Sequence, residues 1–142
     1  MRVNASDQAE QLLMASSPGE LMTAARSLRE MALDVRRQLV HPFAPGTSLQ
    51  LDPTVPEPEL RRAELADLAV DVITATDYLI RLLSGSAIMA SRLTLADPVG
   101  LGGEGSSDEQ AFDRLARRQL DARGAAVRLG TRLLSQLSRD VA

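Results

Sequence analysis

The sequence predicts an all-α protein: a helical bundle of three long helices plus one or two short ones, with a long proline-rich crossover. Leucine and alanine, both strong helix formers, supply 23 and 20 of the 142 residues. Apolar residues recur at three- and four-residue spacing, as in helices buried on one face. No stretch alternates apolar and polar residues in the two-residue period of a strand. One helical domain spanning 1–142 is therefore expected.

A short helix is expected over about 7–15, with Asn4 or Ser6 as its cap. It holds one apolar cluster, Leu12, Leu13 and Met14. So short a helix is marginal in water, so it must dock on the rest of the chain or fray.

The first long helix is predicted over 17–40. It opens on Ser17-Pro18-Gly19-Glu20, which combines a capping box with proline at the first helical position. His41-Pro42 ends it, because the residue before proline is pushed out of the α region. His41 is the only histidine and is expected to cap the helix end rather than to act in catalysis. The predicted buried stripe is Leu21, Ala24, Ala25, Leu28, Met31, Ala32, Val35 and Leu39.

Residues 41–58 form a proline-rich linker, with prolines at 42, 45, 53, 56 and 58. Such a segment is extended and semi-rigid. We expect it to cross the bundle between parallel neighbouring helices, with its spaced apolar residues packed on them: Phe43, Leu49, Leu51 and Val55.

The second long helix is predicted over 58–96, with a possible kink at 84–86. Apolar residues cover more than half of its circumference between Leu65 and Leu83. A helix of this kind is central in a bundle or is buried on a second side by a partner. A glycine-rich loop at 99–107 follows; it lacks the preceding strand and following lysine of a phosphate-binding loop.

The last helix is predicted over 107–140, after capping boxes that begin at Ser106 and Ser107. Its glycines, Gly124 and Gly130, allow a bend. A ridge of small residues would let a neighbouring helix come close: Ala122, Ala126 and Gly130.

Composition excludes several classes of function. The chain has no cysteine and therefore no disulfide, thiol nucleophile or cysteine metal site. A net charge of −3 argues against nucleic-acid binding, and the arginines of the last helix scatter without interleaved aromatic residues. Those arginines are expected to meet acidic surfaces, including the 58–83 helix. Arginine without any lysine indicates a GC-rich bacterial or bacteriophage genome.

We expect a cytoplasmic location. The N-terminus shows no apolar signal region. The most apolar stretch, 65–90, is interrupted by four charged residues, so it is not expected to span a membrane.

One acidic constellation could carry chemistry. Glu64, Asp67 and Asp71 share a helical face, and such carboxylates can hold magnesium. The stretch Glu64-Leu65-Ala66-Asp67-Leu68 resembles the second half of the motif of MazG-like nucleotide pyrophosphohydrolases, which are all-helical and bind magnesium. The resemblance is confined to this stretch and implies a first pair at Glu30 and Asp34, with aspartate where the family prefers glutamate. The alternative is a solvated acidic face beside Arg61 and Arg62.

The leading hypothesis is a non-enzymatic protein-interaction or assembly protein: an adaptor, small chaperone or structural subunit. It predicts self-association through the 65–83 helix or the 115–137 helix, with no catalytic residue, cofactor or metal. The runner-up is a magnesium-dependent all-α nucleotide pyrophosphohydrolase. A helical component of a phage particle or secretion apparatus is a further alternative.

Overall fold

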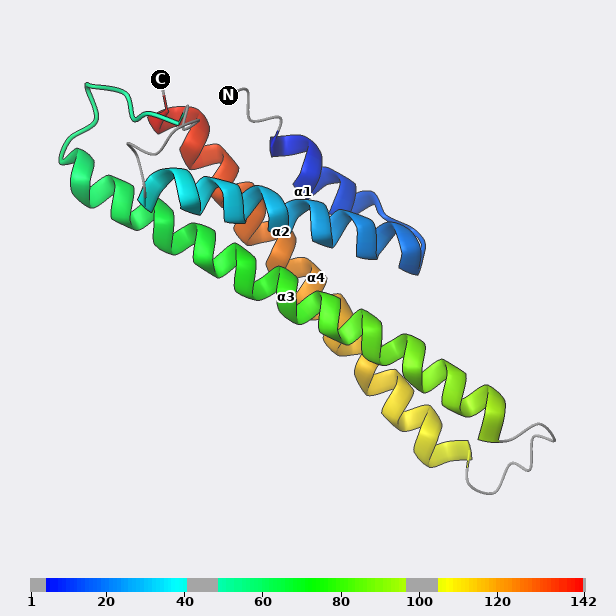
Figure 1. Cartoon of the computed structure of the whole chain (residues 1–142). Helices are drawn as coiled ribbons and strands as arrows, with labels where there is room; N and C mark the ends of the chain where they lie inside the picture. The colour runs from blue at the N-terminus through cyan, green and yellow to red at the C-terminus, as the bar shows by residue number, and fades with distance from the viewer. Residues whose placement is uncertain (1–4, 41–48, 97–104, 142) are drawn as a thin grey trace.

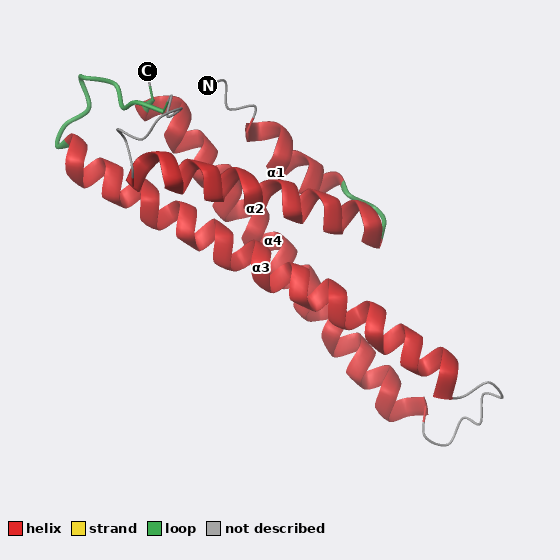
Figure 2. Cartoon of the chain, viewed as in Figure 1, coloured by secondary structure: helices red, strands yellow, loops and turns green. Residues whose placement is uncertain are grey.

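The computed structural model describes residues 5–40, 49–96 and 105–141, with side chains described for 8–40, 49–85 and 109–141. It contains four helices: α1 (Ala5–Met14), α2 (Pro18–Val40), α3 (Pro58–Ala96) and α4 (Gly105–Asp140) (Figure 1). The described residues contain no strand, only an isolated antiparallel bridge between Leu51 and Val141 (Figure 2). The predicted all-α class is confirmed.

Two predicted helix starts are wrong by two residues. α1 and α4 begin at Ala5 and Gly105, so Ser6 and Ser106 lie inside helices and cannot be their N-caps. Once a first turn exists, each further residue adds a hydrogen bond, so a helix extends past the position that sequence chemistry marks as its start. The alternative cap, Asn4, lies outside the described residues.

The predicted cap of α2 is confirmed in part. The Ser17 hydroxyl accepts a hydrogen bond from the Glu20 amide at 3.2 Å. The Glu20 carboxylate, however, accepts from the Ser16 amide at 2.9 Å and from the Ser16 hydroxyl at 3.1 Å. The hydrogen bond from the Ser16 backbone, followed by that from its side chain, lowers the pKa of Glu20. The reciprocal bond of the box is therefore shared with the residue before the cap.

α3 and α4 are the two longest helices, and they pack against each other in antiparallel directions (Figure 1). α2 packs on α3 in the antiparallel direction, with Arg29 paired to Asp77, so the expectation that 41–58 joins parallel neighbours is wrong (Figure 1). α1 lies against both α4 and α2. α3 runs unbroken through Ser84-Gly85-Ser86, where an added side chain at Gly85 would meet nothing within 4 Å.

The wide apolar face of α3 is covered within the chain. α2 lies on one side of it and α4 on another, and the shared core contains Leu65, Leu68, Ala69, Val72, Leu79 and Leu83. The other helices of the chain therefore account for most of the apolar circumference between Leu65 and Leu83, while Val70 and Tyr78 remain exposed.

Small residues bring three helices together at Gly130, on α4. A Cβ atom at this position would lie 3.0 and 3.2 Å from the two methyl carbons of Leu28, on α2, and 3.7 Å from Cβ of Ala9, on α1. Ala122 and Ala126 are buried on the same ridge. The predicted close approach along this ridge is confirmed.

The segment before α3 closes one end of the molecule. Leu49 is buried in the core and donates its amide to the Gln38 side-chain oxygen at 3.0 Å. Leu51 packs on the same core, and the Asp52 amide donates to the Asp140 carbonyl at 2.7 Å. Packing is confirmed for Leu49 and Leu51, and Val55 is half-buried. Phe43 lies outside the described residues, as do His41 and the 99–104 part of the predicted loop.

Candidate functional site

Two carboxylates of the predicted magnesium site, those of Asp34 and Glu64, accept hydrogen bonds from residues of their own helix. Asp34 accepts hydrogen bonds from Arg37 at 2.6 Å and from the Gln38 amide group at 2.7 Å. Glu64 accepts from Arg61 at 3.0 Å. These contacts lie within a single turn of helix in each case, so they orient each carboxylate along its own helix.

The three other acids, Glu30, Asp67 and Asp71, are exposed. Across 5–40, 49–96 and 105–141, no three acidic or histidine side chains lie close enough together to hold a metal ion. The structure therefore does not bring together the residues that the MazG-like resemblance implies. The reason is their placement: the helices meet along their apolar faces, while these acids lie on other faces.

We expect millimolar magnesium to leave the melting temperature of the protein unchanged, because the carboxylates do not converge on one ion. Incubation with nucleoside triphosphates should release no pyrophosphate. Thermal denaturation with and without magnesium checks this in the wild type, in Asp67→Ala and in a matched exposed control, Asp121→Ala. A magnesium-dependent rise that Asp67→Ala alone abolishes would contradict it.

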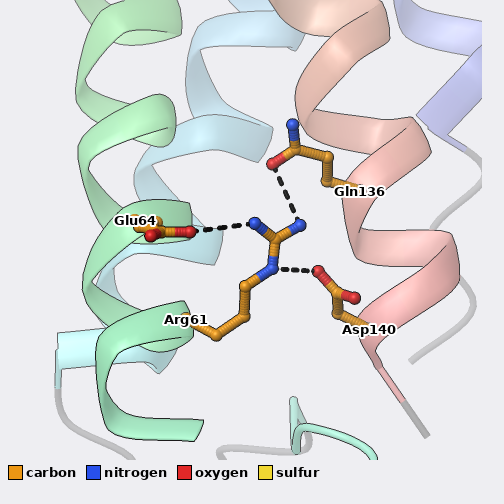
Figure 3. A network of polar contacts seen from close by, with 4 residues as sticks. All are labelled: Arg61, Glu64, Gln136 and Asp140. Carbon is orange, nitrogen blue, oxygen red and sulfur yellow. Dashed lines mark hydrogen bonds and ion pairs between the residues drawn. The ribbon is translucent and has the colours of Figure 1, made fainter. Parts of the chain in front are cut away.

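A polar network joins the start of α3 to the end of α4 (Figure 3). The Arg61 guanidinium donates through Nε to Asp140, through Nη1 to Glu64 at 3.0 Å and through Nη2 to Gln136 at 3.3 Å. The hydrogen bond to Asp140 raises the pKa of Arg61, as the bond to Glu64 does to a lesser extent. Each of the three guanidinium nitrogens donates one hydrogen bond within the network, so Arg61 ties the start of α3 to the end of α4.

Arg123, on α4, caps the last turn of α1. Its Nε donates to the Leu12 carbonyl at 3.0 Å, and Nη2 donates to the Ala15 carbonyl at 2.8 Å and to the Leu13 carbonyl. The last carbonyls of a helix have no partner within the helix, so this arginine satisfies them from a neighbouring element. The sequence offered no signal for this role, because donor and acceptors are more than a hundred residues apart.

The predicted pairing of α4 arginines with α3 acids is wrong for the described residues. There the only ion pair between α3 and α4 is Arg61–Asp140, and its arginine comes from α3. The antiparallel packing sets the α3 acids level with the second half of α4, where Arg128 and Arg132 are exposed. The exposed arginines near the start of α4, such as Arg117, lie level with the last third of α3 instead.

The lengths of the helices leave a step in the molecule. α3 and α4 continue beyond the ends of α1 and α2 as a two-helix arm (Figure 1). Large apolar side chains are exposed at this step: Met14 is 76% exposed, Leu120 68%, Leu13 55% and Phe112 36%. Met14 lines the groove between α1 and α2. We call the others, Leu13, Phe112 and Leu120, together with the exposed Ala116, the step surface.

α1 docks on α4 and α2, one of the two outcomes expected for so short a helix. Leu12 of its apolar cluster is buried, while Leu13 and Met14 are exposed. Successive residues of a helix point about 100° apart, so these three side chains cannot all face the docked side.

A recess of about 120 Å³ adjoins the step surface, between the start of α2 and the facing sides of α3 and α4. The Gln119 side chain closes its floor by donating to the Leu82 carbonyl at 3.0 Å. A larger, open groove of about 620 Å³ lies between α1 and α2. The recess is lined by Leu21, Leu79, Leu83, Ala116, Gln119, Leu120 and Arg123.

No family model, no curated protein and no solved structure matches the chain. Within the part of the chain that the structure describes, no helix is both long enough and apolar enough to cross a membrane.

Proposed function

We propose that this protein is a non-enzymatic helical interaction or assembly protein that self-associates, acting as an adaptor, small chaperone or structural subunit in the bacterial cytoplasm. In this proposal the four helices work as one bundle, with 41–58 as the crossover between α2 and α3. A helical subunit of a phage particle or secretion apparatus is one form that such a protein can take.

The step surface is the observation that carries the proposal. Single exposed apolar residues are normal on a soluble protein, whereas neighbouring ones at one place are typical of interaction sites. Here Phe112, Ala116 and Leu120 are exposed along one stretch of α4, and Leu13 is exposed at the end of α1, where Arg123 of α4 bonds its carbonyl. Full burial of a leucine or phenylalanine side chain contributes about 1.5–3 kcal/mol, so a partner that covers this surface gains several such contributions.

Continuity along α4 supports the same proposal. Arg123 and Gly130 mark the face of α4 on which α1 lies. Counted back at helical spacing, this face passes through Leu120, Ala116 and Phe112. The α4 part of the step surface therefore continues the face that α1 covers further along the helix. It is apolar and exposed, as expected for a surface that binds a partner.

Sedimentation velocity over a range of protein concentrations tests the proposal. We expect the wild type to associate as concentration rises, and Leu120→Glu to remain monomeric because a carboxylate would be buried in the interface. Leu60→Glu is the matched control, since Leu60 is 55% exposed at the far end of α3. A wild type that stays monomeric throughout, or an equal loss of association in both variants, would overturn the proposal.

A further inference from the structure

We infer that the partner of the step surface is a second copy of this chain, whose arm lies antiparallel on the first arm about a two-fold axis near Phe112. This inference rests on the proposed function and names the partner and its orientation.

The shape of the protomer is self-complementary. α3 and α4 form a long layer, and the shorter α1 and α2 cover it at one end only (Figure 1). Among the described side chains, the α4 face beyond α1 is exposed at Phe112, Ala116 and Leu120. Phe112 is the one of these that lies farthest along the arm. A two-fold axis at Phe112 places the arm of each copy beside the arm of the other, in the space beyond the partner's α1 and α2.

Phe112 itself supports this position for the axis. It is one of two phenylalanines in the chain, and it is 36% exposed on a helix with many arginines. With the axis at Phe112, the two copies of this ring meet each other. Aromatic residues are enriched among the residues that dominate interface energies, and aromatic pairs add to the effect of buried area.

The charges around Phe112 match in this orientation. In an antiparallel pair of α4 helices centred at residue 112, Glu109 of one copy lies level with Leu115 of the other. Arg117 of that copy is two residues away, which is about 3 Å along the helix axis. The reverse pair forms by symmetry. Neither side chain has a partner in the described part of its own chain. The two copies of Asp113 approach each other near the axis, and this like-charged pair is exposed to solvent, where repulsion is weak.

The helix ends also agree with the arrangement. α1 runs antiparallel to α4 and ends at the step (Figure 1). An antiparallel α4 of a second copy therefore runs in the same direction as α1, with its first residues next to the end of α1. The partial positive charge of a helix start then lies beside the partial negative charge of a helix end.

The contact spans about three helical turns a side, which is at the low end of interface size. We therefore expect a weak dimer whose population follows protein concentration. The charge pairs give a direct test: Arg117→Glu and Glu109→Arg should each raise the dissociation constant about tenfold, since two pairs per dimer turn from attraction to repulsion. The double variant, Glu109→Arg with Arg117→Glu, should restore the wild-type value.

Cross-linking tests the axis, and the absence of native cysteine makes every introduced thiol unique. Asp113→Cys lies one residue from the axis, so a short bis-maleimide should link two copies of it. Arg128→Cys, exposed on the same helix beyond the arm, and Leu60→Cys are the controls and should stay unlinked.

The outcomes separate the two claims. A dimer that forms while Asp113→Cys stays unlinked and a control is linked would overturn the arm-to-arm arrangement and leave the proposed function standing. Failure of the double charge variant to recover would do the same. A wild type that is monomeric at every concentration would overturn both.

Discussion

Replacing Gly130 by valine is expected to lower the free energy of unfolding by about 2 kcal/mol. A Cβ at this position comes to 3.0 Å from a methyl carbon of Leu28 and to 3.7 Å from Cβ of Ala9. Leu28 is fully buried, so it cannot turn into solvent to make room. The added methyl groups of valine must push α2 or α1 away from α4.

Gly124 provides the matched control on the same helix. An added Cβ there meets nothing within 4 Å, so Gly124→Ala should raise the free energy of unfolding by about 1 kcal/mol through helix propensity alone. Urea denaturation of the wild type and both variants measures the two effects. Equal stability of Gly130→Val and the wild type would mean that α1 and α2 do not approach α4 as closely as described.

Replacing Arg123 by methionine should release α1 from α4 at a cost of about 2 kcal/mol. The change removes every donor to three carbonyls at the end of α1 and keeps most of the apolar stem. A hydrogen bond to a charged group contributes about 1.5–3 kcal/mol, but these carbonyls lie near the surface and water can replace part of the loss. α1 has ten residues and is too short to persist once undocked.

Hydrogen exchange of the α1 amides reports this effect directly. In Arg123→Met we expect α1 to exchange much faster, with the α3 amides between Leu65 and Leu79 unaffected. Arg128→Met, an exposed arginine on the same helix, should leave α1 protected. Unchanged protection of α1 in Arg123→Met would show that apolar contacts alone hold it.

The acidic residues show why a spacing rule did not locate a site. Glu64, Asp67 and Asp71 do lie along one side of α3, as three- and four-residue spacing requires. Whether Glu30 and Asp34 face them depends on how α2 is rotated on α3, and that rotation is set by packing of the apolar stripe. The structure turns Asp34 toward Arg37 and Gln38 instead.

Local patterns by themselves determined the helices. The four helices follow from leucine and alanine periodicity, and the Ser17 cap and Pro18 mark the start of α2, because these signals act between neighbours in the chain. Packing of Leu49 and Leu51 on the core could likewise be expected from apolar residues spaced through a stiff segment.

Tertiary structure alone decided which surfaces remain open. Arg123 meets α1 and Arg61 meets Asp140 across separations that no local pattern encodes. The step arises because α1 and α2 end before α3 and α4 do, and only their packed arrangement shows which apolar residues of α4 that leaves exposed. Periodicity shows that Phe112 and Leu120 lie on an apolar face, whereas the relative position of the helices decides that Leu120 stays exposed among the described residues.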